Sequence, residues 1–358
     1  MKHLYKNLIL STLGMLFLSP VAMAGNEDRI GANGAGQLLI NPWAKSSALA
    51  SSNTANTIGI ESVFGNVAGL AFTKKTEAVF THTRYLSTSG VGINNLGLSQ
   101  KLGENGVLGL TAKMFDFGEI DQTTYENPDG GAGTYRAQYA VVGVSYARAF
   151  SDRIYAGLTA KVVTEGMSNA NATGIAFDGG VRYVAGKKEN IKFGIALKNV
   201  GPKMSYGGDG MSVKETLDGK EFTLEVRSEG FEMPSTLSIG VSYDYYIDEQ
   251  ADSTGKEIKS MHRLTGSGSF LSNSFGRDQV SVGAEYAFKE MFMLRAGLMY
   301  ENGLWDDADN KNIRMGPTFG GGVAVPLTQN GGTLDIDYAY QVTSALGGIH
   351  TIGLRVNL

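Results

Sequence analysis

Two acidic motifs contain the residues of this chain best suited to acid–base catalysis or metal binding. Asp335 and Asp337 stand two positions apart in an alternating segment, so their carboxylates share one face of a predicted strand. Paired carboxylates can act as a general acid and a general base. Other predicted strands carry Arg182, Arg295 and Arg355 on the corresponding face, and enclosed charges usually pair with one another or line water. We therefore expect ion pairs rather than catalysis at Asp335 and Asp337.

The second motif, Asp306 to Asn310, could offer clustered oxygen ligands to Ca²⁺. It lacks the Gly and the terminal Glu of a calcium-binding loop at their places, so a solvated acidic loop explains it better. The chain has no Cys, and His82, His262 and His350 fall in different segments without the spacing of metal ligands. No Ser-His-Asp arrangement can be argued from the sequence. We expect no catalytic residue, no metal, no cofactor and no enzymatic activity.

Residues 1–24 have the pattern of a secretory signal peptide. Lys2 and Lys6 give a positive start, Leu8 to Leu18 form an apolar core, and Ala22-Met23-Ala24 is a small-residue cleavage site. The apolar core is too short for a transmembrane anchor. The remaining chain has no apolar run of about 18 residues, and the net charge of −4 of the whole sequence argues against a nucleic-acid partner. We expect an exported protein, either soluble or a β-barrel in an outer membrane.

Alternation of apolar residues with small or polar ones dominates the chain after residue 75. In 237–245, Leu, Ile, Val and Tyr occupy every second position, which gives a strand with one apolar face. Such segments run about 9–12 residues, the length that a tilted strand needs to cross a bilayer. We count fourteen, at 76–84, 91–101, 106–118, 134–149, 152–166, 170–184, 191–199, 233–246, 260–272, 278–287, 290–300, 316–325, 332–340 and 347–358.

The fold class that this pattern predicts is all-β: a transmembrane antiparallel β-barrel of about fourteen strands over 76–358, embedded in outer-membrane lipid. The charged residues that we expect inside its lumen are Asp178, Arg182, Arg295, Asp335, Asp337 and Arg355. When the connections between these segments are numbered along the chain, the three longest all have odd numbers: 119–133, 200–232 and 301–315. They would lie outside the cell if both ends of the barrel face the periplasm, and a charged connection at 247–259 would lie on the periplasmic side.

Residues 25–75 do not alternate and are rich in Gly, Ala, Ser and Asn. They also contain many apolar residues, among them Leu38, Trp43, Ile60 and Leu70, and a disordered tail would be poor in such residues. We therefore expect an ordered plug, or hatch, folded inside the barrel.

The same segment resembles a known family. The stretches from Gln37 to Leu49 and from Asn66 to Ala71 look like the N-terminal block of the PorV/PorQ family, within the wider FadL-like group of outer-membrane barrels. The residues that carry the plug motif are Asn41, Pro42, Asn66 and Gly69. Later stretches, 150–154, 174–181 and 197–202, extend the resemblance over most of the chain. It implies a 14-stranded barrel with an N-terminal hatch.

Two functions follow from this resemblance and remain open. PorV acts in the type IX secretion system, where its partners are the translocon and cargo that carries C-terminal signal domains. FadL relatives instead pass hydrophobic small molecules through a side opening. We expect a protein of PorV type that acts in secretion or surface assembly, with uptake of a hydrophobic small molecule as the alternative.

Overall fold

A computed structural model describes residues 25–131, 133–218, 220–248, 250–251, 258–306, 309–327 and 332–358. The predicted signal peptide, 1–24, lies outside the described residues, as do Asp307 and Ala308 of the acidic loop. In the described part, β-strands make up almost the whole chain after residue 75, and short helical turns occupy the segment before it.

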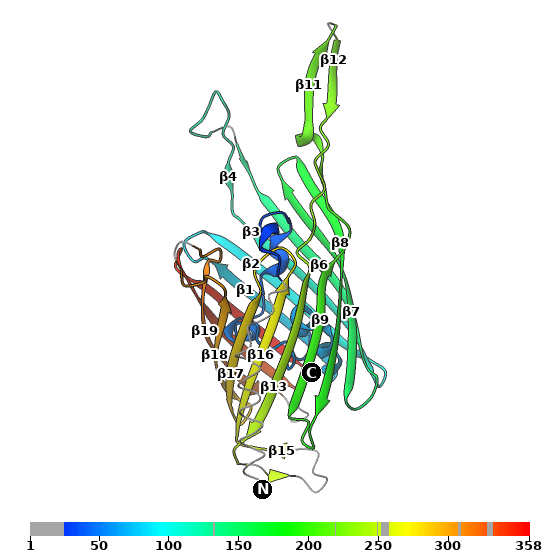
Figure 1. Cartoon of the computed structure of the whole chain (residues 1–358), viewed down its shortest axis with the longest axis vertical. Helices are drawn as coiled ribbons and strands as arrows, with labels where there is room; N and C mark the ends of the chain where they lie inside the picture. The colour runs from blue at the N-terminus through cyan, green and yellow to red at the C-terminus, as the bar shows by residue number, and fades with distance from the viewer. Residues whose placement is uncertain are drawn as a thin grey trace.

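Fourteen of the described strands form one closed antiparallel barrel, which confirms the predicted fold class (Figure 1). Each barrel strand pairs with the next along the chain, and β1 pairs with both β2 and β21, so the ladder returns to its start. The barrel strands are β1 (Thr76–Tyr85), β2 (Val91–Leu102), β3 (Gly106–Asp116), β6 (Ala137–Ala149), β7 (Ile154–Met167), β8 (Ala170–Ala185), β9 (Ile191–Val200), β13 (Thr236–Tyr246), β16 (His262–Asn273), β17 (Gln279–Phe288), β18 (Phe292–Glu301), β19 (Arg314–Pro326), β20 (Thr333–Thr343) and β21 (Ile349–Asn357). Each corresponds to one of the fourteen predicted segments, with ends that differ by a few residues.

The pleat of each barrel strand separates an apolar outer face from a polar inner face. On β1, Phe80 is 47% exposed and Thr81 is 1% exposed. Phe80 stands opposite Leu354 of β21 on the outside, and Thr81 stands opposite Gly353 on the inside. A closed ladder satisfies the strand backbones without water, and an apolar exterior matches hydrocarbon. The barrel wall is therefore suited to a bilayer on one side and to a polar filling on the other.

The connections differ sharply between the two ends of the barrel. At one end, which we call the loop end, lie β4 (Ile120–Asp121) with β5 (Thr134–Tyr135), and a long hairpin of β11 (Ser212–Leu217) with β12 (Lys220–Glu225) that projects far from the wall (Figure 1). The short β10 (Tyr206–Gly207) and the turn η4 (Asp209–Met211) lead into that hairpin. All three long connections lie at this end because an even number of strands separates them.

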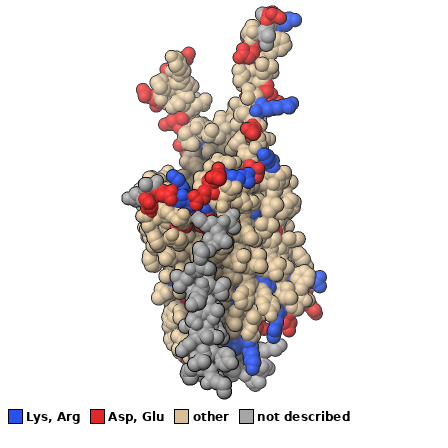
Figure 2. All heavy atoms as spheres, in the orientation of Figure 1, with Lys and Arg blue, Asp and Glu red and all other residues tan. Residues whose placement is uncertain are grey.

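The opposite end, which we call the turn end, carries mostly short turns. The connection predicted at 247–259 lies here and contains the two-residue strands β14 (Gln250–Ala251) and β15 (Ile258–Lys259) (Figure 1). On the face shown in Figure 2, charged side chains gather at the loop end and at the turn end, with a largely uncharged band between them. That distribution is typical of a membrane-embedded wall, since charges on the lipid face are costly.

The N-terminal segment lies inside the barrel as a chain of short turns (Figure 1). Its elements are η1 (Glu27–Arg29), η2 (Gly36–Leu39), α2 (Ala44–Ala48), α3 (Ser62–Gly65) and η3 (Val67–Phe72). Hydrogen bonds reach it from well-separated strands: Thr81 of β1 donates to the Pro42 carbonyl at 2.8 Å, and Thr318 of β19 donates to the Ala48 carbonyl at 2.8 Å. None of the helices in the described residues is long and apolar enough to span a membrane.

Candidate functional site

The barrel wall is irregular at the junction of β8 and β9. Gly179 pairs with Leu197, but Phe177 pairs with Val200, so Asp178 alone stands opposite both Lys198 and Asn199. This two-against-one register is a β-bulge. Asn199 takes a φ of 60°, a left-handed conformation that Asn tolerates better than most residues, and its backbone N–H donates to Asp178 Oδ1 at 2.6 Å. The Asp178 carboxylate therefore accepts the hydrogen bond that a backbone carbonyl would accept in a regular ladder.

Beyond the bulge, β8 continues toward the loop end without β9 as its neighbour. The chain leaves β9 through Gly201 and Pro202, and the next strand bond to β8 comes only where Tyr206 of β10 pairs with Ala172. Gly201 packs so tightly against the Ile175 carbonyl that no side chain could be accommodated there. The wall here is closed by packing of a turn rather than by a continuous hydrogen-bonded ladder.

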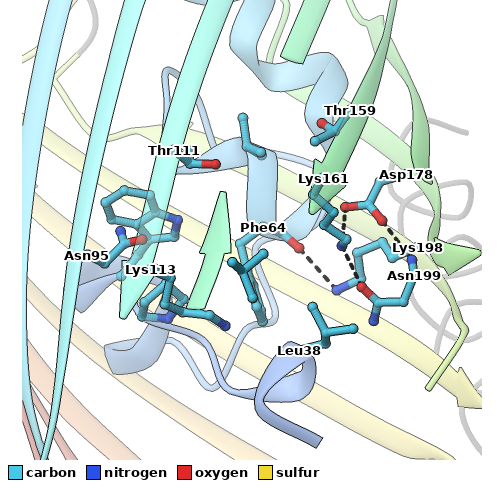
Figure 3. Close-up of a pocket in the computed structure, with 14 residues that line it drawn as sticks. Leu38, Phe64, Asn95, Thr111, Lys113, Thr159, Lys161, Asp178, Lys198 and Asn199 are labelled. Carbon is cyan, nitrogen blue, oxygen red and sulfur yellow. Dashed lines mark hydrogen bonds and ion pairs between the residues drawn. The ribbon is translucent and has the colours of Figure 1, made fainter. Parts of the chain in front are cut away.

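A small cavity of about 50 Å³ lies just inside the bulge, between the wall and the N-terminal segment (Figure 3). Its lining residues come from the N-terminal segment and from β2, β3, β6, β7, β8 and β9. They are Leu38, Pro42, Trp43, Val63, Phe64, Asn95, Thr111, Lys113, Val141, Thr159, Lys161, Asp178, Lys198 and Asn199. One water needs about 10–15 Å³ of such a cavity, so this one holds a few waters or one small chemical group.

Three lysines and one aspartate carry the charge around this cavity, and we call them the cavity cluster: Lys113, Lys161, Asp178 and Lys198. Lys161 donates to Asp178 Oδ2 at 2.7 Å and to Asn199 Oδ1 at 2.5 Å. Among the described residues, Lys113 and Lys198 reach no carboxylate and donate instead to backbone carbonyls, at 2.7 Å for Gln37 and 3.1 Å for Phe64. Both ammonium groups lie over the Phe64 ring, at 5.4 Å and 4.7 Å from its centre.

An apolar groove of about 940 Å³ lies on the outer face of the same wall. Gly179 has no side chain to fill the surface there, and large side chains surround it: those of Leu158, Phe177, Leu197 and Val200. Of the residues that the structure describes, Asp178 is the one that lines both this groove and the inner cavity. Asp178 of the bulge thus lies between the inner cavity, which is partly open, and the lipid-facing groove.

A third hollow, of about 430 Å³, opens at the loop end above the N-terminal segment, and we call it the vestibule. Leu39, Ile40 and Asn41 line it, whereas their neighbours Leu38, Pro42 and Trp43 line the cavity on the other side, so residues 38–43 separate the two spaces. At its rim, Arg277 donates to Asp309 Oδ1 at 2.8 Å, and this hydrogen bond holds the pKa of Asp309 below its ordinary value.

The opposite side of the lumen holds a second set of charges, which we call the anchor cluster: Lys45, Glu61, Glu77, Arg263, Glu285, Arg295, Asp337 and Arg355. Arg295 bridges Glu285 at 2.6 Å and Asp337 at 2.5 Å. Arg355 bridges Glu61 of the N-terminal segment at 2.6 Å and Glu77 of β1 at 3.4 Å. Burial raises the pKa of Glu61, and the Arg355 guanidinium opposes that shift.

The six predicted lumen charges divide between these sites. Asp178 belongs to the cavity cluster, and Arg295, Asp337 and Arg355 belong to the anchor cluster. Arg182 is buried but contacts no acid among the described residues; it donates to the Thr57 carbonyl at 2.9 Å and lies over the Phe72 ring. Asp335 stands opposite Arg355 in the ladder yet accepts only from Asn357, at 3.2 Å, so it does not share the ion pairs of Asp337.

The residues of the predicted plug motif shape the turns of the N-terminal segment. Asn41 accepts from the Trp43 backbone N–H at 3.0 Å, and Pro42 offers its carbonyl to the wall. Asn66 accepts from Ala68 N at 3.1 Å, which caps η3, and donates to the Val181 carbonyl of β8 at 3.0 Å. Gly69 approaches the Thr57 carbonyl too closely for any Cβ. Whether the segment blocks passage through the lumen stays a prediction.

Two features of this site were not found from the sequence. The bulge was missed although two polar residues in succession, Lys198 and Asn199, interrupt the alternation; this interruption and the Gly201-Pro202 pair that follows were its local signals, and both also suit an ordinary strand end. Lys113 and Asn95 were not singled out, because each looks like any polar residue on an inner face. Their importance comes from strands that meet only in the folded barrel.

The barrel can be compared with known proteins now that its geometry is described. No protein-family model and no curated protein matches the sequence. Among solved structures, the CymD monoaromatic hydrocarbon channel is 13% identical with a TM-score of 0.52, over 89% of this chain and 97% of that one. The Pseudomonas putida toluene transporter TodX is 11% identical with a TM-score of 0.52, over 88% and 97%.

These likenesses show the fold. The chain is an outer-membrane β-barrel. Both neighbours are named as a channel or transporter of hydrocarbons, and no comparison supports the PorV/PorQ family or type IX secretion specifically.

Proposed function

We propose that this barrel carries small hydrophobic molecules across the outer membrane and releases them sideways through the wall at the β8–β9 bulge. The observation that carries the proposal is the position of Asp178, which is shared by the inner cavity and the outer apolar groove. The groove is large and lined by apolar side chains, as expected of a surface that receives a hydrophobic molecule. The structural neighbours named as hydrocarbon channels favour the same reading.

The path that we propose starts in the vestibule, passes residues 38–43, enters the cavity and leaves beside Asp178. A ladder that is already interrupted costs less to open than a regular one, because fewer strand hydrogen bonds must be broken. The wall beyond the bulge relies on the packing of Gly201 against Ile175 rather than on strand pairing. The proposal includes no catalysis: the chain binds and passes its ligand without changing it.

A disulfide across the bulge tests this path. The chain has no Cys, so Phe177→Cys with Val200→Cys introduces a single possible bond between paired, outward-facing residues of β8 and β9. Paired residues on antiparallel strands lie about 4.5–5.5 Å apart between Cα atoms, within disulfide range. Cells that display this variant should take up labelled toluene, benzoate or both when it is reduced, and neither when it is oxidised.

The matched control joins two strands where the ladder is regular. Val162→Cys with Ile175→Cys crosses the β7–β8 pair on the same outer face. This bond should leave uptake unchanged. If the bond across the bulge also leaves uptake unchanged, or if the reduced protein takes up neither probe, the proposed side exit is wrong.

One observation favours protein secretion as a second candidate. The β11–β12 hairpin projects beyond the barrel and exposes Val213, Phe222 and Leu224 at 45–48%. Val213 pairs with Leu224, and Phe222 lies two residues from Leu224, so all three share one face. An exposed apolar face on a free hairpin suits contact with another protein. Secretion components that co-purify with the barrel in mild detergent, and are lost when 212–225 is deleted, would favour this candidate.

A further inference from the structure

The charges of the cavity cluster do not balance. Lys113, Lys198 and Asp178 are 6%, 9% and 6% exposed, and the side chain of Lys161 is 11% exposed. Asp178 is the one carboxylate among the described residues that line the cavity, against three ammonium groups. Burying a charge without a partner costs several kcal/mol, so two uncompensated cations around one small space favour an anion there.

The hydrogen-bond donors of the cavity are also unsatisfied. Asn95 is 3% exposed and lines the cavity, and its Nδ2 group has no hydrogen-bond partner in the part of the chain that the structure describes. Lys198 has three donor hydrogens and a single hydrogen bond, to the Phe64 carbonyl. A buried donor without an acceptor destabilises the folded protein. Every one of these groups would gain from an acceptor that carries negative charge.

The remaining wall of the cavity is apolar and aromatic. Figure 3 shows Lys113 on one side of the Phe64 ring and Lys161 and Lys198 on the other. Trp43, Val63 and Leu38 complete this surface. The volume of about 50 Å³ admits the acid group of a ligand but not a ring, since a cavity that holds benzene measures about 150 Å³, so a ring would lie at the open side of the cavity against these side chains. The surroundings thus match a compact group that is charged at one edge and apolar over its faces.

We propose that this cavity binds the carboxylate of a compact organic acid, such as a single ring that carries an acid group. Lys113, Lys198 and Asn95 would hold the carboxylate, while the apolar part would lie against Phe64 and Trp43. This inference rests on the proposed function and narrows it, because a neutral hydrocarbon would leave the excess charge of the cavity cluster unpaired.

The chain carries its own reporter for this site. It has two tryptophans: Trp43 is 1% exposed and lines the cavity, whereas Trp305 is 59% exposed in a loop. Trp305→Phe leaves Trp43 as the single tryptophan, whose fluorescence is observed by exciting where the sixteen tyrosines do not absorb. In the full-length protein in detergent, benzoate should change the Trp43 fluorescence saturably, and added NaCl should weaken its binding. Toluene has the same ring and no charge. Its Kd should be at least about tenfold higher than that of benzoate, because a hydrogen bond to a charged group contributes about 1.5–3 kcal/mol.

Substitutions at Lys198 test the assignment directly. In the Trp305→Phe background, Lys198→Met should raise the Kd for benzoate about tenfold and leave that for toluene unchanged, by the same hydrogen-bond argument. Lys198→Arg keeps the charge and should bind benzoate nearly as well as the parent. Lys187→Met, in an exposed turn, should change neither affinity. Heat-modifiability on gels verifies that each variant is folded.

Three results would overturn the proposal: equal affinity for toluene and benzoate, unchanged benzoate affinity in folded Lys198→Met, or acetate competing as well as benzoate. The last would leave no role for the apolar wall. The test is separable from that of the side exit. If the bulge disulfide blocks uptake but benzoate does not bind at Trp43, passage stands and acid recognition fails. If benzoate binds but the disulfide has no effect, the reverse holds.

Discussion

The anchor cluster and the cavity cluster lie on different sides of the same lumen and differ in how their charges are balanced. The anchor cluster has four acids and four bases, joined by short ion pairs such as Arg295 with Asp337 at 2.5 Å and Arg355 with Glu61 at 2.6 Å. The cavity cluster has three bases and one acid, and two of its lysines bind only backbone carbonyls. The charges of the anchor cluster balance one another, whereas the cavity cluster has an excess of positive charge.

This difference assigns separate roles to the two sides. Glu61 and Lys45 belong to the N-terminal segment, so the anchor cluster ties that segment to β17 and β21 through ion pairs. The cavity exists only because the segment forms its inner wall with Leu38, Pro42 and Trp43. A segment held rigidly on one side can leave an ordered, unfilled and positively charged space on the other, as a binding site requires.

Removal of residues 31–60 should have the largest effect of the changes considered, and the property affected is conductance. The deletion takes away the inner wall of the cavity but leaves Glu61 and the ion pairs within the barrel. Strand pairing satisfies the barrel backbone without this segment, so the variant should still insert. Its conductance in a planar bilayer should rise well above that of the intact protein, since the lumen loses its filling. Deletion of 212–225, a hairpin outside the barrel, is the matched control and should leave conductance unchanged. Equal conductance of folded intact and 31–60-deleted protein would show that the segment does not block the lumen.

The anchor cluster should respond strongly to loss of a single charge. Arg295→Met leaves Glu285 and Asp337 buried without their shared partner, which should lower the free energy of unfolding by about 3–5 kcal/mol. Urea unfolding in lipid vesicles measures this loss. Arg84→Met, an exposed position on β1, removes the same charge without breaking a described ion pair and should cost little. If the two variants unfold alike, the anchor cluster does not stabilise the protein in this way.

The sequence was sufficient for the barrel because strand signals are local. Alternation places Phe80 outside and Thr81 inside whatever the neighbouring strand is, so fourteen segments could be counted before any pairing was known. Even the Ser- and Gly-rich segment at 260–272 forms β16. The poorly alternating segment at 134–149 is divided between β5 and β6, which begins at Ala137.

The sequence was insufficient where function depends on contacts between strands. A bulge is a mismatch of register between two strands. That Lys198 and Asn199 together face the single residue Asp178 is known only once the pairing of β8 with β9 is known. The ion pairs were assigned only by shared face, so Asp335 and Arg182 were expected to pair as Asp337 does. Their real partners, Asn357 and the Thr57 carbonyl, depend on depth in the barrel and on the N-terminal segment. The short turns of that segment have no periodicity from which they could be predicted.

The smallest change in stability should follow from loss of a charge in the cavity cluster. Lys198→Met gives up one hydrogen bond, to the Phe64 carbonyl at 3.1 Å, and one cation–π contact. The hydrogen bond to a charged group contributes about 1.5–3 kcal/mol and the cation–π contact about 0.5–2 kcal/mol, but the substitution also removes the cost of burying the ammonium group and its repulsion from Lys113 and Lys161. Lys198→Met should therefore change the free energy of unfolding by no more than about 1 kcal/mol, in contrast to Arg295→Met in the same urea experiment.

Saturating benzoate makes this last comparison sharper. A ligand that binds only the folded protein stabilises it in proportion to the logarithm of its concentration over its Kd. Benzoate should therefore raise the urea midpoint of the parent protein and of Arg84→Met, but raise that of Lys198→Met much less. If Lys198→Met loses as much stability as Arg295→Met without ligand, Lys198 is a structural cation like those of the anchor cluster, and the contrast between the two sides of the lumen fails.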